Sequence, residues 1–556
     1  MRKRVSSRGL TVNAIAGTHV VTLGLDLSDA RREGCLGFAI QREDHTEDER
    51  YWMRGMKTFE ETDPGLGPGG TVPSSEHPFQ GFQWADYSAK PEHEYTYTVV
   101  PLGGEPATLT RGGAVSVKIA TEPELGVPHS VFFNRGAVAA QEYARRFQDK
   151  QPSQLADPAA RDAAYSWLSR GLFEAFKAFL ARADGADYEL HAAIYEFNWP
   201  QALGAFRSAA RSGAKVEVLF HNVKPEESTE RKNRAAIAAA KIKGICTPRT
   251  TGNLMHNKFV VLTRKGTPVA VWTGSTNLSE NGIFGHLNCG HIVESEPVAR
   301  AYLEYWQELR TNPDAAAERA WMEEHNPSPP DPWDQDLTLV FSPHKGNAVL
   351  DWYKTIAAGA KDALFMTFAF GMDERFKEVY GTDDEVLRIA LMEQEGTARF
   401  LEREREVIRK LRARPNVLIA VGNRIMTTSF DRWLAERGGL TTNVEWVHTK
   451  FMLVDPLSRA PVVVTGSANF SKASTSSNNE NMLVIRGDTR AADIYLGELM
   501  RVWNHYAFRE SVARAKQRGE TGWRPQHLAP SAAWQRDYYS SHHDRSLRRR
   551  YFAQTL

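Results

Sequence analysis

The first 125 residues alternate apolar and polar positions in short runs, with clusters of turn-forming residues between them. Alternation places every second side chain on the same face of an extended chain, which is typical of half-buried β-strands. The clearest predicted strands are Thr18–Leu27, Cys35–Arg42, Glu94–Pro101 and Ala114–Thr121. Short strands separated by turn signals predict an all-β sandwich over residues 1–125.

From residue 126 onward, apolar strands alternate with helical patterns. Tyr188–Phe197 and Ala363–Phe370 are mostly apolar, as expected of strands in a sheet that is covered on both faces. Such alternation predicts a duplicated α/β fold. The expected division is a first half over 126–325, a Pro-rich linker over 326–335, a second half over 336–510 and a tail over 511–556.

The second half is expected to contain an insertion. A helix is predicted over Pro200–Ser212 in the first half, leading to the strand Val216–Phe220. The second half has a longer helical region, Asp373–Arg414, before the strand Val417–Val421. Its mixed charges at helical spacing predict a solvated helix face or, alternatively, a lid over the site.

Two segments nearly two hundred residues apart carry the same polar residues at the same spacing. They are HNKFVVLTRKGTPVAVWTGSTNLSENGIFGHLN, from His256, and HTKFMLVDPLSRAPVVVTGSANFSKASTSSNNE, from His448. In both, a lysine follows the histidine by two residues and a Gly-Ser-x-Asn sequence follows it by eighteen. Identical spacing indicates an internal duplication.

Each copy predicts a strand, a turn, a return strand and a polar loop. Strand geometry puts His256 and Lys258 on one face, and likewise His448 and Lys450. The loops add hydroxyl and amide donors, at small residues where an anion could approach closely. These donors are Ser275, Asn277, Ser467 and Asn469.

Two imidazoles, two ammonium groups and two donor loops suit displacement at phosphorus. That reaction needs cations and donors on the equatorial oxygens, a nucleophile on one side and an acid opposite. The repeated His-x-Lys-x4-Asp and Gly-Ser-x-Asn patterns resemble the phospholipase D superfamily over residues 130–510. The resemblance implies two α-β-α halves whose motifs meet at a pseudo-twofold axis, and phosphodiester chemistry without metal or organic cofactor.

The two copies differ from each other at two positions of this pattern. The motif aspartate is Asp455 in the second copy, but Thr263 stands in its place in the first. The closing acid is Glu480 in the second copy, but Asn288 stands in its place in the first. Either difference is compatible with a first half of reduced activity.

In the family the closing acid orients an imidazole across the interface, so the resemblance implies that Glu480 serves His256 and Asn288 serves His448. A carboxylate fixes the tautomer and stabilises a cationic phosphohistidine, whereas a neutral amide suits an acid that gives its proton away. We therefore assign His256 as nucleophile and His448 as general acid, and the swapped roles stay open.

The remaining site residues take supporting roles. We expect Lys258, Lys450, Asn277 and Asn469 to hold the phosphate oxygens, with Ser275 and Ser467 as supporting donors. Asp455, Glu480 and Asn288 are expected to orient them. His286 and His291, which flank Asn288, are expected at most behind the residues that touch phosphate.

Part of the predicted sandwich resembles a fibronectin type III domain. The segment Trp84–Pro101 places Tyr95 four residues after Pro91, where that family has a tyrosine corner. Such a module binds, spaces or rigidifies, and its partner stays open.

Composition excludes several classes of protein. Hydrophobic residues make up 42% and charged residues 25% of 556 residues, as in globular proteins with ample core, and the net charge is +1. No global basic field therefore indicates nucleic acid or anionic membrane. Three scattered cysteines, no apolar signal segment and no stretch of eighteen apolar residues favour a cytoplasmic protein. Because one chain holds both motif copies, a monomer is expected.

The C-terminal tail combines aromatic and basic residues, among them Trp534, Tyr538, Tyr539, Arg548, Arg549, Arg550, Tyr551 and Phe552. Such a tail can stack on bases, contact anionic headgroups as a peripheral membrane site, or pack on the body of the protein.

The sequence leaves three functions open. A phosphodiesterase of phospholipase D type acting on phospholipid comes first. A metal-independent nuclease or DNA-processing phosphodiesterase comes second. A binding or scaffold protein with a decayed site, marked by Thr263 and Asn288, comes third.

Overall fold

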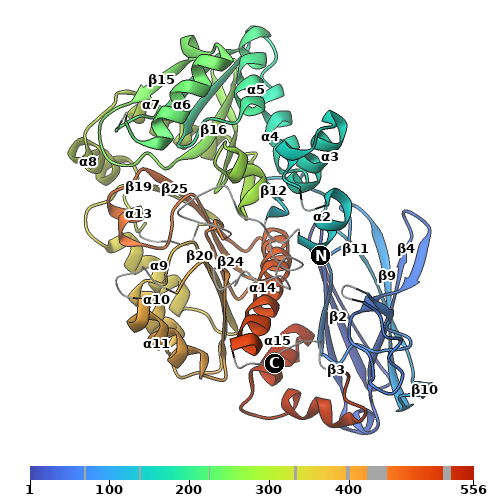
Figure 1. The fold of residues 1–556 in the computed structure, drawn as a ribbon. Coiled ribbons are helices and arrows are strands. Elements are labelled where there is room, and N and C mark those ends of the chain that lie inside the picture. The colour runs from blue at the N-terminus through green and yellow to red at the C-terminus, as the bar shows by residue number, and fades with distance from the viewer. Residues whose placement is uncertain are drawn as a thin grey trace.

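The computed structural model describes residues 1–67, 70–136, 140–148, 150–224, 226–330, 333, 335–395, 401–422, 447–517 and 527–555. A β-sandwich, two α/β units and a C-terminal segment follow one another along the chain (Figure 1). This is the predicted multidomain layout.

The N-terminal region consists of two antiparallel sheets. One has the order β1-β2-β3-β8 and the other the order β10-β9-β4-β5, with β11 also pairing with β9. The strands are β1 (Arg2–Ser7), β2 (Leu10–Ala16), β3 (Val21–Leu27), β4 (Gly37–Asp44), β5 (Glu49–Trp52), β8 (Gln83–Asp86), β9 (Glu94–Glu105), β10 (Thr108–Arg111) and β11 (Val115–Ala120). A short helix α1 (Asp29–Arg32) and the pair β6 (Arg54–Gly55) and β7 (Val72–Pro73) complete it.

Alternation along these strands builds the sandwich core. In β11, Val115, Val117 and Ile119 are buried, whereas the residues between them are not. Tyr95 of β9 is fully buried, and its hydroxyl accepts a hydrogen bond from the Lys90 backbone N–H at 2.9 Å. This is the geometry of a tyrosine corner. Assignment to the fibronectin type III class itself stays a prediction.

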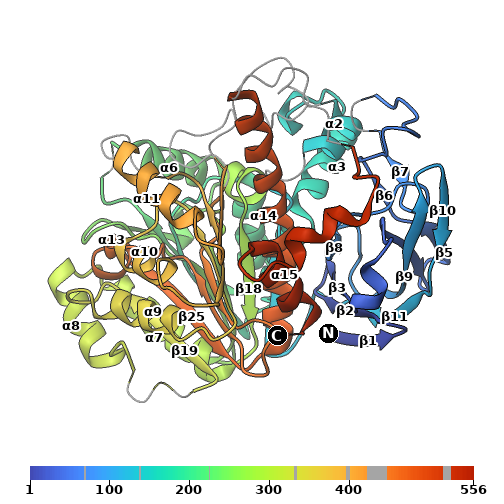
Figure 2. The same cartoon turned by 90° about the horizontal axis from the view of Figure 1, so that it is seen from below.

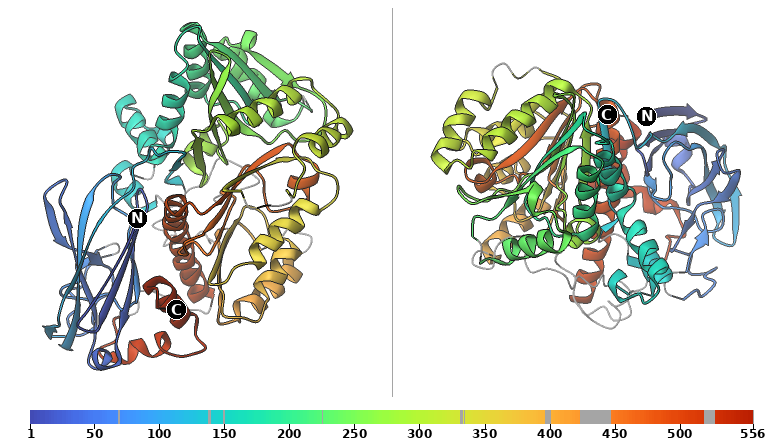
Figure 3. Two further views of the ribbon diagram at one scale, coloured as in Figure 1. Left: turned by 180° about the vertical axis from the view of Figure 1, so that it is seen from behind. Right: turned by 90° about the horizontal axis from the view of Figure 1, so that it is seen from above.

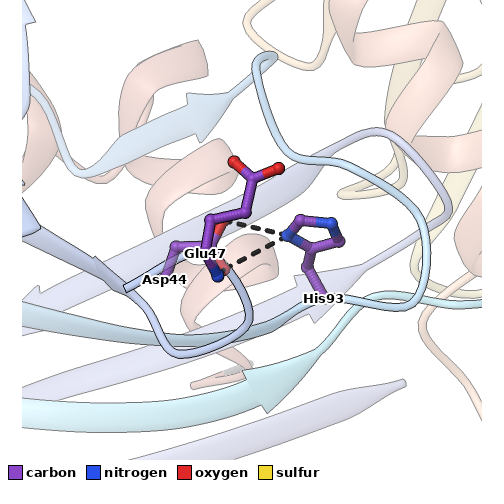
Figure 4. A group of neighbouring side chains, drawn as sticks. All are labelled: Asp44, Glu47 and His93. Carbon is purple, nitrogen blue, oxygen red and sulfur yellow. Dashed lines mark hydrogen bonds and ion pairs between the residues drawn. The ribbon is translucent and has the colours of Figure 1, made fainter. Parts of the chain in front are cut away.

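Asp44 and His93 join two loops of the sandwich (Figure 4). His93 Nδ1 lies 2.9 Å from Asp44 Oδ2, and the backbone N–H groups of Thr46 and Glu47 donate to Asp44 Oδ1. Glu47 pairs with Lys90. Within the described residues, Asp44, Glu47 and His93 are the one group close enough to share a metal ion. Because both carboxylates already have protein partners, we interpret the group as a structural link between loops.

Each α/β unit contains a seven-stranded mixed sheet, and the two strand orders are equivalent. The orders are β12-β18-β17-β16-β13-β14-β15 and β19-β25-β24-β23-β20-β21-β22. The first sheet comprises β12 (His129–Phe133), β13 (Tyr188–Ile194), β14 (Lys215–His221), β15 (Cys246–Arg249), β16 (Lys258–Arg264), β17 (Thr267–Gly274) and β18 (Cys289–Val293). The second comprises β19 (Leu337–Ser342), β20 (Ala363–Phe368), β21 (Leu387–Met392), β22 (Val417–Val421), β23 (Phe451–Val454), β24 (Val462–Gly466) and β25 (Glu480–Arg486). This shared topology confirms the duplication.

Helices cover both sheets. Those of the first half are α2 (Ala140–Phe147), η2 (Pro152–Gln154), α3 (Pro158–Ser169), α4 (Leu172–Ala181), α5 (Pro200–Arg211), α6 (Ser228–Ala240), η3 (Lys243–Ile245), η4 (Asn281–Gly285), α7 (Glu296–Arg310) and α8 (Ala315–His325). The second half has α9 (Ala348–Ala358), α10 (Glu374–Tyr380), α11 (Leu401–Arg412), α13 (Lys472–Ser476) and α14 (Thr489–Gln517). One hydrophobic cluster runs through both halves and includes Tyr302 and Trp306 of α7 and Tyr495 and Leu499 of α14.

The predicted insertion in the second half was misplaced. Within the expected helical region Asp373–Arg414, residues Leu387–Met392 form β21, the counterpart of β14. Leucine, arginine, alanine and methionine favour helices, but burial between parallel neighbours decides the outcome. The longer connection is residues 422–450, between β22 and β23, against 250–257 between β15 and β16. Most of it, 423–446, lies outside the described residues. Helix α11 buries Ile408 and Leu411 and exposes its charged face, as predicted.

The C-terminal segment packs between the sandwich and the second half (Figures 2 and 3). Its elements are η6 (Ala532–Tyr538) and α15 (Asp544–Ala553). The rings of Trp534 and Tyr538 lie 5.3 and 5.1 Å from that of Phe82, centroid to centroid. Phe552 is fully buried, and a Cβ on Gly24 of β3 would meet its backbone at 2.1 Å. Of the alternatives for the tail, packing on the body is the one that the structure contains.

The same side of the paired α/β units carries helix α14, which contacts the sandwich through β2 (Figure 3). No helix among the described residues is long and apolar enough to cross a bilayer.

Candidate functional site

The two His-x-Lys segments lie where β16 and β23 begin. His256 and His448 precede these strands, and Lys258 and Lys450 follow each histidine by two residues. Each lysine ammonium donates to the carbonyl of its own histidine. His256 is 7% exposed, His448 6%, and each lysine 1%, so four basic side chains share one buried place.

Backbone bridges across the pseudo-twofold axis bring the halves together at this point. Met255, just before His256, pairs with Asn479, just before Glu480. In the same way, Val447, just before His448, pairs with Leu287, just before Asn288. Each half therefore presents its closing residue to the histidine of the other half, as the resemblance implied.

Side-chain hydrogen bonds follow this pairing. His256 Nδ1 lies 3.0 and 2.9 Å from the two carboxylate oxygens of Glu480. His448 Nδ1 lies 2.9 Å from Asn288 Oδ1. The two rings are 6.3 Å apart, centroid to centroid. Both Nδ1 atoms are thereby engaged, which leaves each Nε2 for chemistry at a group between the rings.

The orientation of the Asn288 amide is set by its own contacts. Its Nδ2 donates to the Gly282 carbonyl at 2.8 Å, so its Oδ1 faces His448 and accepts from that ring. A carbonyl oxygen on Nδ1 requires a proton there. His448 therefore carries its proton on Nδ1 when neutral.

The two serines differ from their predicted role. Ser467 Oγ donates to Glu480 Oε2 at 2.6 Å, and Ser275 Oγ donates to Asn288 Oδ1 at 2.8 Å. Their backbone N–H groups donate to carbonyls of the neighbouring strand. A hydroxyl that gives its single proton to the orienting residue has none left for phosphate. In this structure the serines hold Glu480 and Asn288 in place.

Asn277 and Asn469 lie in the loops that follow these serines. The side-chain oxygen of each is buried without a hydrogen-bond partner. Because side-chain amides can be turned end for end, this marks one unused polar end on each asparagine. A phosphate oxygen is a ligand of the required kind, so their predicted role stays a proposal.

Asp455 does not orient the catalytic groups. It lies at the far end of β23 from His448, and its carboxylate accepts from the backbone N–H groups of Lys361, Asp362 and Ala363 at the start of β20. Its φ of +46° fits that tight turn. Thr263, its counterpart in the first half, is a buried residue inside β16. The replacement is therefore no sign of a decayed site.

Burial and like charges lower the pKa values of the basic groups. Burial lowers the pKa of His256 to about 4, although Glu480 opposes the shift, and lowers that of Lys258 to about 7. Burial and then Lys450 hold the pKa of His448 well below its usual value, and burial and Lys258 do the same for Lys450. The site therefore gains most from a ligand that brings negative charge.

Two residues at the site were not assigned to it from the sequence. The Tyr195 ring, which follows β13, lies 5.1 Å from the His256 ring, and Lys258 Nζ lies 5.2 Å above it. The ring of His286 lies 5.7 Å from that of His448. No repeat marks Tyr195, because its counterpart in the second sheet is Ala369. His286 was expected only behind the contact residues.

Comparison with known proteins was made by sequence and by structure. The family description "Cardiolipin synthase, PLD-like domain" matches residues 179–310 and 382–503. A comparison with curated protein sequences finds no significant match.

Solved structures of similar fold include three enzymes. Phosphatidylserine synthase from Haemophilus influenzae is 11% identical, with 62% of this chain and 90% of that chain covered and a TM-score of 0.43. Yeast tyrosyl-DNA phosphodiesterase is 14% identical, with 57% and 87% covered and a TM-score of 0.33. Polyphosphate kinase from Porphyromonas gingivalis is 13% identical, with 58% and 46% covered and a TM-score of 0.35.

The two matched segments fall on the two α/β units, and each contains one His-x-Lys and Gly-Ser-x-Asn copy. Both copies converge on a single buried site across the pseudo-twofold axis. This chain belongs to the phospholipase D superfamily of phosphodiesterases and phosphotransferases.

Proposed function

We propose that the chain cleaves a phosphodiester bond of a phospholipid through a phosphohistidine at His256. The observation that carries this proposal is the difference between the partners of the two histidines. A carboxylate lies on Nδ1 of His256, whereas a neutral amide lies on Nδ1 of His448. Only a ring that becomes cationic within a covalent bond gains from a permanent anion at that position.

In the first step the Nε2 lone pair of His256 attacks phosphorus, and the bond from phosphorus to the leaving oxygen breaks. Nδ1 keeps its proton and donates to Glu480, so the new cation faces an anion. His448, protonated on both nitrogens at this stage, transfers its Nε2 proton to the leaving oxygen and stays bonded to Asn288 through Nδ1.

In the second step water takes the place of the leaving group. His448 Nε2 accepts a water proton as the oxygen bonds to phosphorus, and the electron pair of the breaking N–P bond returns to His256. An alcohol in place of water gives exchange of the headgroup. We infer that hydrolysis and exchange share this intermediate.

Charge supports binding of a phosphodiester. Lys258 and Lys450 are both buried, and one buried carboxylate, Glu480, stands beside them. A bound diester adds the missing negative charge, raises the pKa of both lysines and of His448, and so draws in the proton that the acid must deliver. Asn277 and Asn469 offer amide groups to the same oxygens. No metal is needed for these steps, so we expect activity to survive a chelator.

Two observations favour a phospholipid as substrate. The matching family description is named for cardiolipin synthase. In the structure, the strand registers equate Glu196, after β13, with Phe370, after β20. Phe370 is 43% exposed beside the site. An aromatic ring there suits acyl chains better than the charged backbone of a nucleic acid, and the net charge of +1 supplies no general attraction for DNA.

The test is a turnover assay in EDTA with phosphatidylcholine vesicles, single-stranded DNA and double-stranded DNA, each with His256→Ala and His448→Ala as controls. We expect headgroup release that both variants lose. DNA cleavage without lipid turnover would replace the proposal by a nuclease. No turnover and no labelled protein with any substrate would favour a binding protein.

Phe370 tests the substrate class separately. We expect Phe370→Ser to lower turnover on vesicles several-fold and to leave turnover of a short-chain, water-soluble phosphodiester unchanged. Equal loss on both substrates would show that the ring supports the fold and does not contact lipid.

A further inference from the structure

A third imidazole lies beside the proposed acid. The rings of His286 and His448 are 5.7 Å apart, centroid to centroid, and inclined by 40°. His286 is half-buried, whereas His448 is 6% exposed. At this separation no more than one water molecule fits between the facing edges, which is within reach of proton transfer.

The backbone holds His286 at this point through an uncommon turn. Residues Asn281–Gly285 form one turn of π-helix, closed by the His286 N–H, which donates to the Asn281 carbonyl at 2.8 Å. Asn134 Nδ2 donates to the carbonyl of His286 at 2.6 Å and to that of Ile283 at 2.8 Å. Single π-turns are rare and frequent at functional sites.

The second half has no equivalent imidazole. Its corresponding segment is the α-helical turn α13, and the counterpart of His286 is Asn478. Asn478 Nδ2 contacts Glu480 at 3.4 Å. The nucleophile therefore has an amide behind its carboxylate, whereas the acid has a second imidazole beside it. The duplication does not require this difference.

The acid also faces a supply problem. Lys450, His286, Lys258 and His256 all lower the pKa of His448, so the free site holds its ring neutral. Asn288 has already committed its Nδ2 to Gly282 and has no proton to give. The proton that His448 delivers must reach a nearly buried ring in each turnover.

We propose that His286 relays protons between solvent and His448. This inference rests on the function proposed above. When substrate brings its negative charge, protonated His286 passes a proton to His448 Nε2, directly or through one water, and becomes neutral. His448 then protonates the leaving oxygen. In the second step His448 takes a proton from water and returns it to His286, which releases it to solvent. His286 acts through His448 and forms no bond to phosphorus.

The test compares His286→Asn, which copies the residue of the second half, with the wild type and with His45→Asn, the same change in the sandwich. Turnover is measured at constant pH and ionic strength while the concentration of imidazole buffer is raised. We expect His286→Asn to lose about tenfold or more in kcat, as for loss of a proton-transfer group, with KM little changed. Added imidazole should restore much of that loss and should leave the wild type and His45→Asn unaffected.

Two outcomes would overturn the inference. One is a kcat for His286→Asn within twofold of the wild type at every buffer concentration. The other is a loss that imidazole does not restore, which indicates a structural role. Both differ from failure of the proposed function, in which His256→Ala and His448→Ala keep their activity.

Discussion

Glu480→Gln replaces the carboxylate behind the proposed nucleophile by an amide of the same shape. The wild-type carboxylate is fully buried, accepts from His256 Nδ1 at 2.9 and 3.0 Å and accepts from Ser467 Oγ at 2.6 Å. The variant keeps an acceptor for His256 and removes the charge. His256 then has the kind of partner that His448 has in the wild type.

The magnitude follows from the charge that is lost. A buried hydrogen bond to a charged group contributes about 1.5–3 kcal/mol. Because the charge matters most once His256 is cationic, the loss falls on phosphohistidine formation. At about 1.4 kcal/mol per factor of ten, this predicts a decrease of about 10- to 150-fold in its rate. The measurement is single-turnover labelling of the protein, with thermal unfolding as a check on folding.

Asn288→Asp is the matched change on the other side. It adds a carboxylate on His448 Nδ1, raises the pKa of that ring and makes it a weaker proton donor. We expect a smaller loss in kcat than for Glu480→Gln, and an alkaline limb of the pH profile that moves to higher pH. A Glu480→Gln variant that labels at the wild-type rate, while Asn288→Asp abolishes labelling, would refute the assignment and exchange the two roles.

Three further predictions concern pH and stability. Since His256 is a free base above about pH 4 and Lys258 loses its charge above about pH 7, kcat/KM should be highest between these values and fall at higher pH; a profile that is flat from pH 7 to 9 would contradict this. Glu318→Ala should leave the buried Arg249 guanidinium without its carboxylate and cost about 3–5 kcal/mol in the free energy of unfolding, measured with denaturant, whereas a loss below about 1 kcal/mol would show that water replaces the partner. Gly24→Val should displace α15 from the sandwich, because its Cβ has no room beside Phe552, and should expose the C-terminal segment to limited proteolysis; unchanged protection would show that the backbone yields instead.

The sequence was sufficient for the parts of the molecule that repeat. Equal spacing of two motif copies predicted the duplication, and with the family resemblance it predicted that Glu480 would reach His256 and Asn288 would reach His448. These contacts depend on backbone bridges beside each residue, which a symmetric arrangement of two equal segments reproduces.

Other features depend on tertiary contacts that leave no local pattern. The strand β21 has the composition of a helix and is extended because parallel strands lie on both sides of it. Ser275 and Ser467 have the residue type of phosphate donors, but their hydroxyls are taken by neighbouring side chains. Asp455 matches the motif, yet it caps a turn at the other end of its strand.

The tail and the third imidazole show the same limit. The aromatic residues of the tail could not be distinguished by composition from a binding surface, because the sandwich face that covers them lies hundreds of residues earlier. His286 is unremarkable in the sequence, and it becomes significant only when a π-turn and a cross-axis pairing place it beside His448.

The most direct test of the central claim is the position of the covalent bond. His448→Ala protein is mixed with substrate radiolabelled at phosphorus, quenched in alkali, which preserves phosphohistidine, and mapped by mass spectrometry. We predict label on His256, stable because the variant cannot activate water, and no label in His256→Ala. Label on another residue, or turnover of substrate with no labelled protein at any time, would contradict the account.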